Sequence, residues 1–171
     1  LNFEINDISK IKYLIKTNNV SGLNITIPYK SSVTPFLVFI SEDAKEIGAV
    51  NTIKIIDGKL HGFNTDIIGF EKSITPILKN RKTALILGNG GASKAIQFVL
   101  SKLNVNYKIV SRNTYFDYHN IDKEIMESSD IIINTTPLGT YPKTSELPNI
   151  PYQFLNSKHL LFDLVYNPKV S

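Results

Sequence analysis

The stretch that most restricts the fold of this chain covers residues 83–103 and has the sequence TALILGNGGASKAIQFVLSKL. An apolar run of strand length is followed by a glycine-rich turn and then by apolar residues at helical spacing. A strand without polar alternation belongs in a sheet that is covered on both faces. Because strands and helices continue to alternate after residue 103, the second half of the chain is predicted to form a parallel α/β sheet.

The glycine-rich turn is a candidate ligand site. Gly88, Gly90 and Gly91 stand between the predicted strand and helix, where backbone can approach a pyrophosphate. The amides and dipole of the helix N-terminus favour the negative charge of such a group. The spacing is G-x-G-G rather than G-x-G-x-x-G, so a purely structural turn is the alternative. The position between strand and helix favours a dinucleotide site.

The end of the next predicted strand indicates which dinucleotide is bound. Sites for NAD usually carry Asp or Glu about 20 residues after the glycines, bonded to the ribose. Here the strand YKIV is followed by SRN, which contains Arg112 and no acidic residue. A guanidinium pairs with a 2′-phosphate, so we expect NADP. The alternative is a solvated arginine at a strand end.

The first half of the chain is predicted to contain shorter elements. Residues 23–27 alternate between apolar and polar side chains, which predicts a strand that ends at Pro28. Residues 32–47 are predicted to be helical. The sequences AVNTIKII and KLHGF flank an Asp-Gly turn and predict a β-hairpin.

Three polar residues accompany these elements and converge if the elements share a sheet. Lys30 follows the first strand, Asn51 lies in the hairpin, and Asp66 follows it. Taken singly, Lys30 is a solvated charge and Asp66 an N-cap of the next helix. With its ordinary pKa of about 10.4, lysine is a poor base at neutral pH. An adjacent aspartate instead orients the ammonium to donate a proton while a carbonyl is reduced.

Composition removes several classes of function. The sequence contains no cysteine, which excludes disulfides, thiolate metal sites and cysteine nucleophiles. No apolar run reaches the roughly 18 residues that a membrane span requires. The net charge of +4 comes from scattered lysines, which suits small anionic ligands better than nucleic acid. We expect a cytoplasmic protein with no metal, membrane or nucleic-acid partner.

Several motifs occur together in the order and spacing found in shikimate dehydrogenases, and the chain resembles that family. They are LNITIPYK, GAVNT, GFNTDIIGF, LGNGGASKA, SRN, INTTPLG and FDLVYNP. The resemblance extends from about residue 20 to the end. The N-x-T-x-P-x-K and N-T-D motifs are specific to the family and its close relatives, whereas the glycine loop alone is not.

The resemblance implies a reversible, NADPH-dependent reduction of 3-dehydroshikimate to shikimate in chorismate and aromatic amino-acid biosynthesis. The expected fold is α/β, with an N-terminal α/β substrate domain, a C-terminal Rossmann-type domain with a parallel sheet, and a cleft between them. We place the substrate-binding domain at residues 1–66, a connecting helix at 67–80 and the NADP-binding domain at 81–171. A monomer or homodimer is expected.

The resemblance also implies residue roles. Lys30 would exchange the proton on the reacting oxygen, while Asp66 binds a ring hydroxyl and orients Lys30. The positions that match substrate contacts are Thr26, Asn51, Asp66 and Tyr166. The positions that match cofactor contacts are Glu42, Gly88, Asn89, Gly90, Gly91, Ala92, Arg112, Asn113, Thr136 and Leu164. Of these, Arg112 and Asn113 match the adenosine phosphate site, and Thr136 the nicotinamide side.

The sequence departs from the family pattern at both ends. It begins at Leu1, without the strand and serine-containing loop that hold the substrate carboxylate. It ends without the helices that carry further glycine and glutamine contacts. Both ends are therefore interpreted as truncated parts of a longer protein. The loop SRNTYFDY lacks a second basic residue, so the expectation of NADP depends mainly on Arg112.

Two other functions stay open. A quinate or quinate/shikimate dehydrogenase would use the same lysine–aspartate pair on a substrate with one more hydroxyl. A non-catalytic NADP-binding module has no need of Lys30, Asn51 and Asp66 together, so their joint presence speaks against it.

Overall fold

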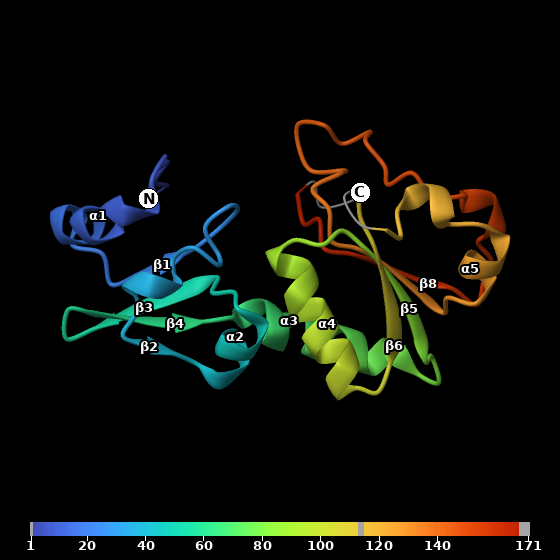
Figure 1. Cartoon of the computed structure of the whole chain (residues 1–171), viewed down its shortest axis with the longest axis horizontal. Helices are drawn as coiled ribbons and strands as arrows, with labels where there is room; N and C mark the ends of the chain where they lie inside the picture. Colours follow the sequence, from blue (N-terminus) through green and yellow to red (C-terminus); the bar gives the residue numbers. More distant parts are fainter. Residues whose placement is uncertain (1, 113–114, 168–171) are drawn as a thin grey trace. The chain divides into compact units, whose positions relative to one another are not determined.

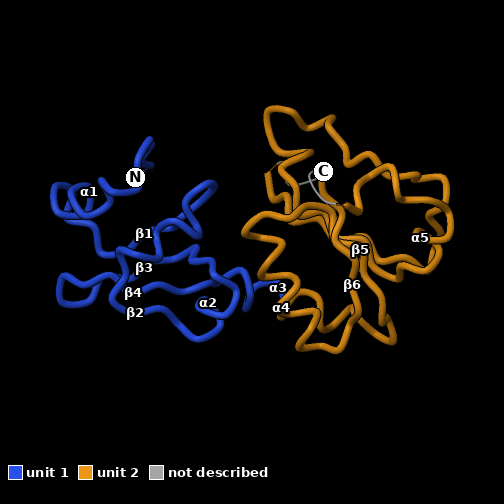
Figure 2. The backbone as a smooth tube through the Cα atoms, in the orientation of Figure 1, with its two compact units in different colours: residues 1–70 blue, residues 71–171 orange. Residues whose placement is uncertain are grey.

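The computed structural model describes residues 2–112 and 115–167. The chain divides into two compact units, Leu1–Phe70 and Glu71–Ser171 (Figure 2). The division falls inside α3 (Thr65–Leu78), a helix of 14 residues that begins in the first unit and ends in the second.

The first unit contains a four-stranded sheet in the order β1-β3-β4-β2 (Figure 1). The expected hairpin is present: β3 (Thr52–Ile56) and β4 (Lys59–Phe63) pair antiparallel. Strand β1 (Gly22–Asn24) pairs antiparallel with β3, and β2 (Phe39–Ile40) pairs parallel with β4. The hairpin therefore occupies the centre of the sheet, with a short strand at each edge.

Two helices contribute to the core of this unit. They are α1 (Ile11–Asn18), which follows a 3-10 turn at Ile8–Lys10, and α2 (Glu42–Ile47). Each helix buries an apolar residue in one cluster with the inward residues of the hairpin, because strand side chains alternate between faces. The buried members of this cluster are Ile11, Ile25, Val33, Ala44, Val50, Ile53 and Leu60.

Two local expectations for the first unit are wrong. The helix expected over residues 32–47 is replaced by a 3-10 turn at Thr34–Phe36, then β2, and only then α2. Pro35 is compatible with the first turn of the short helix at Thr34–Phe36. Phe39 and Ile40, in the apolar run that follows, pair with β4 and do not continue the helix. The first strand ends at Asn24, although the Ile25 N–H still donates to the Asn51 carbonyl at 2.7 Å.

The second unit contains four parallel strands in the order β6-β5-β7-β8, of which Figure 1 labels β5, β6 and β8. The strands are β5 (Thr83–Leu87), β6 (Asn106–Val110), β7 (Ile131–Asn134) and β8 (Leu160–Asp163). All three neighbouring pairs are parallel, which confirms the expected parallel sheet. Strand β6 lies on one side of β5 and β7 on the other. In open α/β sheets, ligands bind outside the carboxyl ends of the strands at such a switch point.

Helices and turns connect the strands of the second unit. The helices are α4 (Gly91–Lys102) and α5 (Lys123–Glu127), and 3-10 turns lie at Tyr118–Asn120 and Tyr152–Phe154. Residues 84–87 of β5 are at most 3% exposed, as expected for a strand covered on both faces. In the described part of the chain, no helix has the length and apolarity needed to cross a membrane.

The carboxylate of Asp130 joins the amino ends of β5 and β7. Its Oδ2 accepts hydrogen bonds from the Lys82 N–H at 2.8 Å, the Thr83 N–H at 3.1 Å and the Thr83 hydroxyl at 3.0 Å. These bonds, led by the one from Lys82, hold the pKa of Asp130 below its ordinary value. They favour the charged form of the carboxyl group.

We expect Asp130→Asn to lower the free energy of unfolding by roughly 0.5–1.5 kcal/mol at pH 7, because Asn keeps an acceptor oxygen but loses the charge, and solvent screens part of the effect. A depressed folded pKa stabilises the protein above the unfolded value of about 3.9, and the contribution is lost as the pH falls through the folded value. The difference between wild type and variant should therefore shrink below about pH 4. Urea unfolding at several pH values measures it, with the exposed turn variant Asp57→Asn as control. A difference that does not change with pH would contradict this assignment.

Candidate functional site

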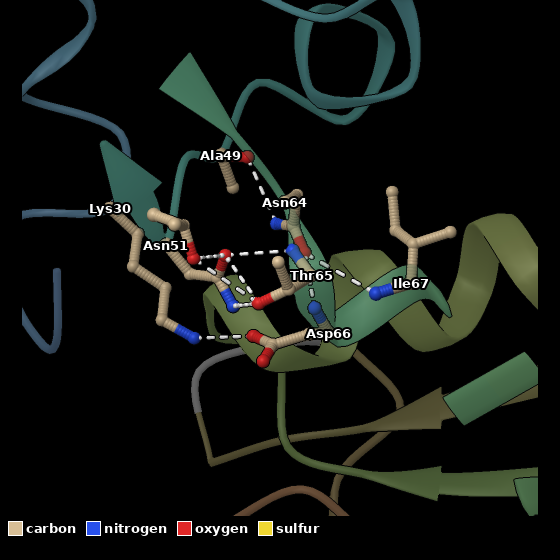
Figure 3. Close-up of polar contacts among 8 residues, drawn as sticks. Lys30, Ala49, Asn51, Asn64, Thr65, Asp66 and Ile67 are labelled. Carbon is tan, nitrogen blue, oxygen red and sulfur yellow. Dashed lines mark hydrogen bonds and ion pairs between the residues drawn. The ribbon is translucent and has the colours of Figure 1, made fainter. Parts of the chain in front are cut away.

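Lys30 and Asp66 form an ion pair in the first unit (Figure 3). The distance from Lys30 Nζ to Asp66 Oδ2 is 2.6 Å, and the two side chains are 17% and 33% exposed. The pair is thus partly shielded from water while still open to a small molecule. The other carboxylate oxygen, Oδ1 of Asp66, has no hydrogen-bond partner among the described residues, so it is free to accept a bond from a ligand hydroxyl.

The backbone of Lys30 is held by the turn that follows β1. Its carbonyl accepts a hydrogen bond from the Val50 N–H at 2.7 Å, which ties the turn to the start of the hairpin. The next residue back, Tyr29, donates its hydroxyl to the Ile5 carbonyl at 2.6 Å and its N–H to the Thr26 carbonyl at 2.9 Å. The lysine side chain therefore extends from a fixed backbone position.

Asn64, and not Asp66, caps α3. The Asn64 Oδ1 accepts hydrogen bonds from the N–H groups of Asp66 at 3.0 Å and Ile67 at 3.4 Å, as an N-cap side chain does. Its Nδ2 donates to the Ala49 carbonyl at 3.0 Å, and the residue is only 2% exposed. The interpretation of Asp66 as N-cap is wrong, and its carboxylate is left to engage Lys30. Negative charge in the first helical turn is also favoured by the helix dipole.

Asn51 ties the start of α3 to the hairpin (Figure 3). Its Oδ1 accepts from the Thr65 N–H at 2.8 Å and from the Thr52 hydroxyl at 3.0 Å, and its Nδ2 donates to Thr65 Oγ1 at 3.1 Å. Asn51 is 8% exposed. The structure brings Asn51, Lys30 and Asp66 together as the sequence predicted. It also shows that much of the hydrogen-bonding capacity of Asn51 is used within the protein.

The remaining predicted substrate contacts, Thr26 and Tyr166, and the predicted cofactor contact Glu42 lie outside this hydrogen-bonded cluster. Thr26 is exposed and precedes Lys30 in the same connection. Glu42 is exposed and opens α2, in the unit that does not contain the glycine loop. Tyr166 is 92% exposed and belongs to the second unit, whereas the other predicted substrate contacts belong to the first.

The glycine loop connects β5 to α4 in the second unit. Gly88 has a φ of +110°, and a Cβ at this position would come within 2.7 Å of Thr135 Oγ1. Glycine is therefore required by both conformation and space. Gly90 is the N-cap of α4 without a capping side chain, and Gly91 opens the helix. Asn89 is exposed and Ala92 lies in the first turn, so the amides of this helix end can bind an anion.

Arg112 lies in a turn just after β6 and is exposed. Burial raises the pKa of the Tyr118 phenol, and the positive charge of Arg112 acts in the opposite direction. The charge of the exposed Arg112 guanidinium therefore acts on Tyr118. Asn113 lies outside the described residues.

The loop after β7 carries Thr136. Its hydroxyl donates to Asn134 Oδ1 at 2.6 Å, and Leu164, just after β8, donates its N–H to the Asn134 carbonyl at 3.1 Å.

The sequence motifs did not single out Asn64 or Asn134 as site residues, although each lies in a motif that was recognised. Within residues 2–112 and 115–167, no group of three or more His, Asp or Glu side chains is arranged to hold a metal ion.

Comparison with known sequences places these features in context. The family model described as the shikimate dehydrogenase substrate binding domain matches residues 1–53. A shikimate dehydrogenase (NADP(+)) from Methanosphaera stadtmanae is 40% identical over 95% of this chain and 66% of its own length. The corresponding protein from Methanococcus maripaludis strain C6 is 40% identical over 98% of this chain and 67% of its own length. The chain thus spans about two thirds of the length of these relatives.

Solved structures agree with the sequence matches. Shikimate dehydrogenase from Aquifex aeolicus superposes with a TM-score of 0.84 at 33% identity, over 96% of this chain and 66% of that one. Shikimate 5-dehydrogenase from Thermus thermophilus, in complex with NADP(H) and shikimate, gives 0.77 at 28% identity, over 94% and 64%. Quinate dehydrogenase from Corynebacterium glutamicum, in complex with NAD, gives 0.81 at 27% identity, over 95% and 65%.

Proposed function

Because this chain belongs to the shikimate dehydrogenase family, we propose that it catalyses the reversible, NADPH-dependent reduction of 3-dehydroshikimate to shikimate in chorismate biosynthesis. The observation that most supports this activity is the ion pair between Lys30 and Asp66 at 2.6 Å. Reduction of a ketone to an alcohol requires a proton for the carbonyl oxygen, and an oriented ammonium is suited to supply it.

Lys30 and Asp66 have different roles in the proposed reaction. When bound, NADPH supplies the hydride that the carbonyl carbon accepts. Lys30 Nζ donates a proton to the carbonyl oxygen as the hydride arrives, which yields the alcohol. Asp66 Oδ2 holds the ammonium in place, and Oδ1 accepts a hydrogen bond from a ring hydroxyl of the substrate. Thr26, Asn51 and Tyr166 are proposed as further substrate contacts.

The second unit is suited to hold NADP(H). The backbone at Gly90, where a Cβ would meet no described atom within 4 Å, and the N-terminal amides of α4 fit a pyrophosphate, with Gly88 in the turn before the helix and Gly91 at its start. Exposed Arg112 fits the 2′-phosphate, Thr136 would contact the nicotinamide side, and Leu164 would contact the cofactor. Asn89, Ala92 and Glu42 complete the proposed cofactor contacts, together with Asn113. The proposed roles are substrate binding for residues 1–66 and NADP binding for residues 81–171, in a cytoplasmic monomer or homodimer.

A direct assay tests this function. The purified protein is mixed with NADPH and 3-dehydroshikimate, and consumption of NADPH is followed by its absorbance. We expect oxidation that depends on 3-dehydroshikimate, with a higher kcat/KM for shikimate than for quinate in the reverse direction. A preference for quinate would favour the quinate dehydrogenase alternative. Binding of NADPH without turnover of either substrate would favour the non-catalytic module.

A further inference from the structure

Asn134 is a buried polar residue at the end of an otherwise apolar strand. It follows Ile131, Ile132 and Ile133 in β7 and is 8% exposed. A polar side chain in such a place is costly unless it is hydrogen-bonded. The carboxamide of Asn134 makes four hydrogen bonds, and none of them goes to the helices that cover the sheet.

The bonds of Asn134 order the loop that follows β7. Its Oδ1 accepts from the N–H of Thr136 at 3.0 Å and from the Thr136 hydroxyl at 2.6 Å. Its Nδ2 donates to the Leu138 carbonyl at 3.3 Å. An asparagine side chain is suited to this task because it offers a donor and an acceptor at once.

The remaining bond of Asn134 reaches the next strand. Nδ2 donates to Asp163 Oδ1 at 3.1 Å, and Asp163 is the last residue of β8, directly opposite Asn134 in the ladder. The same Oδ1 accepts from the Val165 N–H at 2.9 Å, and the Asn134 carbonyl accepts from the Leu164 N–H at 3.1 Å. The Asn134–Asp163 bridge therefore fixes the backbone on both sides of Leu164.

We infer that Asn134 and Asp163 are positioning residues for the nicotinamide half of the cofactor site. This inference rests on the proposed function, in which Thr136 contacts that half and Leu164 contacts the cofactor. The two residues would touch neither cofactor nor substrate. They act by holding the loop after β7 and the segment after β8 in register, so that the nicotinamide is presented in one orientation.

Two substitutions of Asp163 separate positioning from general structural support. Asp163→Asn keeps an oxygen that can accept from both Asn134 Nδ2 and the Val165 N–H. Asp163→Ala removes both bonds. We expect Asp163→Ala to lower kcat and the affinity for NADPH by roughly five- to tenfold, because hydrogen bonds of this kind contribute modestly. The conservative Asp163→Asn should stay close to wild type.

A nicotinamide-free analogue supplies the readout that does not depend on activity. Calorimetric titration with 2′-phospho-ADP-ribose measures binding through all groups of the cofactor except the nicotinamide ring. For Asp163→Ala we expect unchanged affinity for this analogue, weakened affinity for NADPH, and faster hydrogen exchange at the Val165 N–H. Equal losses for NADPH and the analogue, or wild-type values for both, would overturn the positioning role. A wild-type protein that binds neither molecule would contradict the proposed function and this inference with it.

Discussion

Replacing Lys30 by alanine is expected to lower the turnover number by about 10²- to 10⁴-fold, the usual contribution of a general acid or base. The Lys30 ammonium lies 2.6 Å from the Asp66 carboxylate, which holds it in one orientation. The affinity for 3-dehydroshikimate should change much less, because proton donation is made in the transition state and not in the bound ground state. Single-turnover kinetics and equilibrium binding of the substrate separate these two quantities.

The partner residue gives a matched comparison. Asp66→Asn should lower the turnover number and also weaken substrate binding, because Asp66 is proposed to accept a hydroxyl as well as to orient Lys30. The losses of the two single variants should not add in the double variant, since the pair acts as a unit. Lys54→Ala, which removes an exposed lysine from β3, serves as control. Near wild-type turnover of Lys30→Ala would contradict the role of Lys30 as proton donor and show that it is a surface charge.

Replacing Arg112 by alanine is expected to raise the KM for NADPH by about ten- to a hundredfold, the value of a charge-assisted bond to phosphate of roughly 1.5–3 kcal/mol. The KM for NADH should change much less, because NADH has no 2′-phosphate. Steady-state rates with both cofactors measure the ratio. The KM of Arg112→Lys for NADPH should be intermediate, because lysine keeps the positive charge but cannot bind the phosphate in a bidentate manner. Equal losses with NADPH and NADH would contradict the assignment of Arg112.

The second unit was the more predictable part of the fold. The run TALIL is apolar at nearly every position, and the glycines after it mark the turn into α4, so local pattern alone indicated a buried strand and a helix. The parallel order then followed from the alternation of strands and helices. In the first unit, FLVFI fits a helix or a strand equally well, and its pairing with β4 is a tertiary contact that periodicity does not reveal.

The site was predictable only in part. Lys30 and Asp66 are 36 residues apart, and their proximity was inferred from motifs and not from spacing. The sequence Asn-Thr-Asp offers more than one possible N-cap, and only the structure shows that Asn64 takes this role while Asp66 faces Lys30. Asn134 was visible as a polar residue after three isoleucines, but its partner Asp163 comes 29 residues later.

The place at which the chain divides has a consequence for how such an enzyme can evolve. Lys30, Asn64 and Asp66 all precede the division inside α3, whereas Gly88 and Arg112 follow it. Under the proposed function, acid–base chemistry and nucleotide preference are therefore encoded in separate, consecutive stretches of the gene. Selection for a different nucleotide can alter the second stretch while the proton donor is inherited unchanged, and recombination near residue 70 would exchange one property without the other.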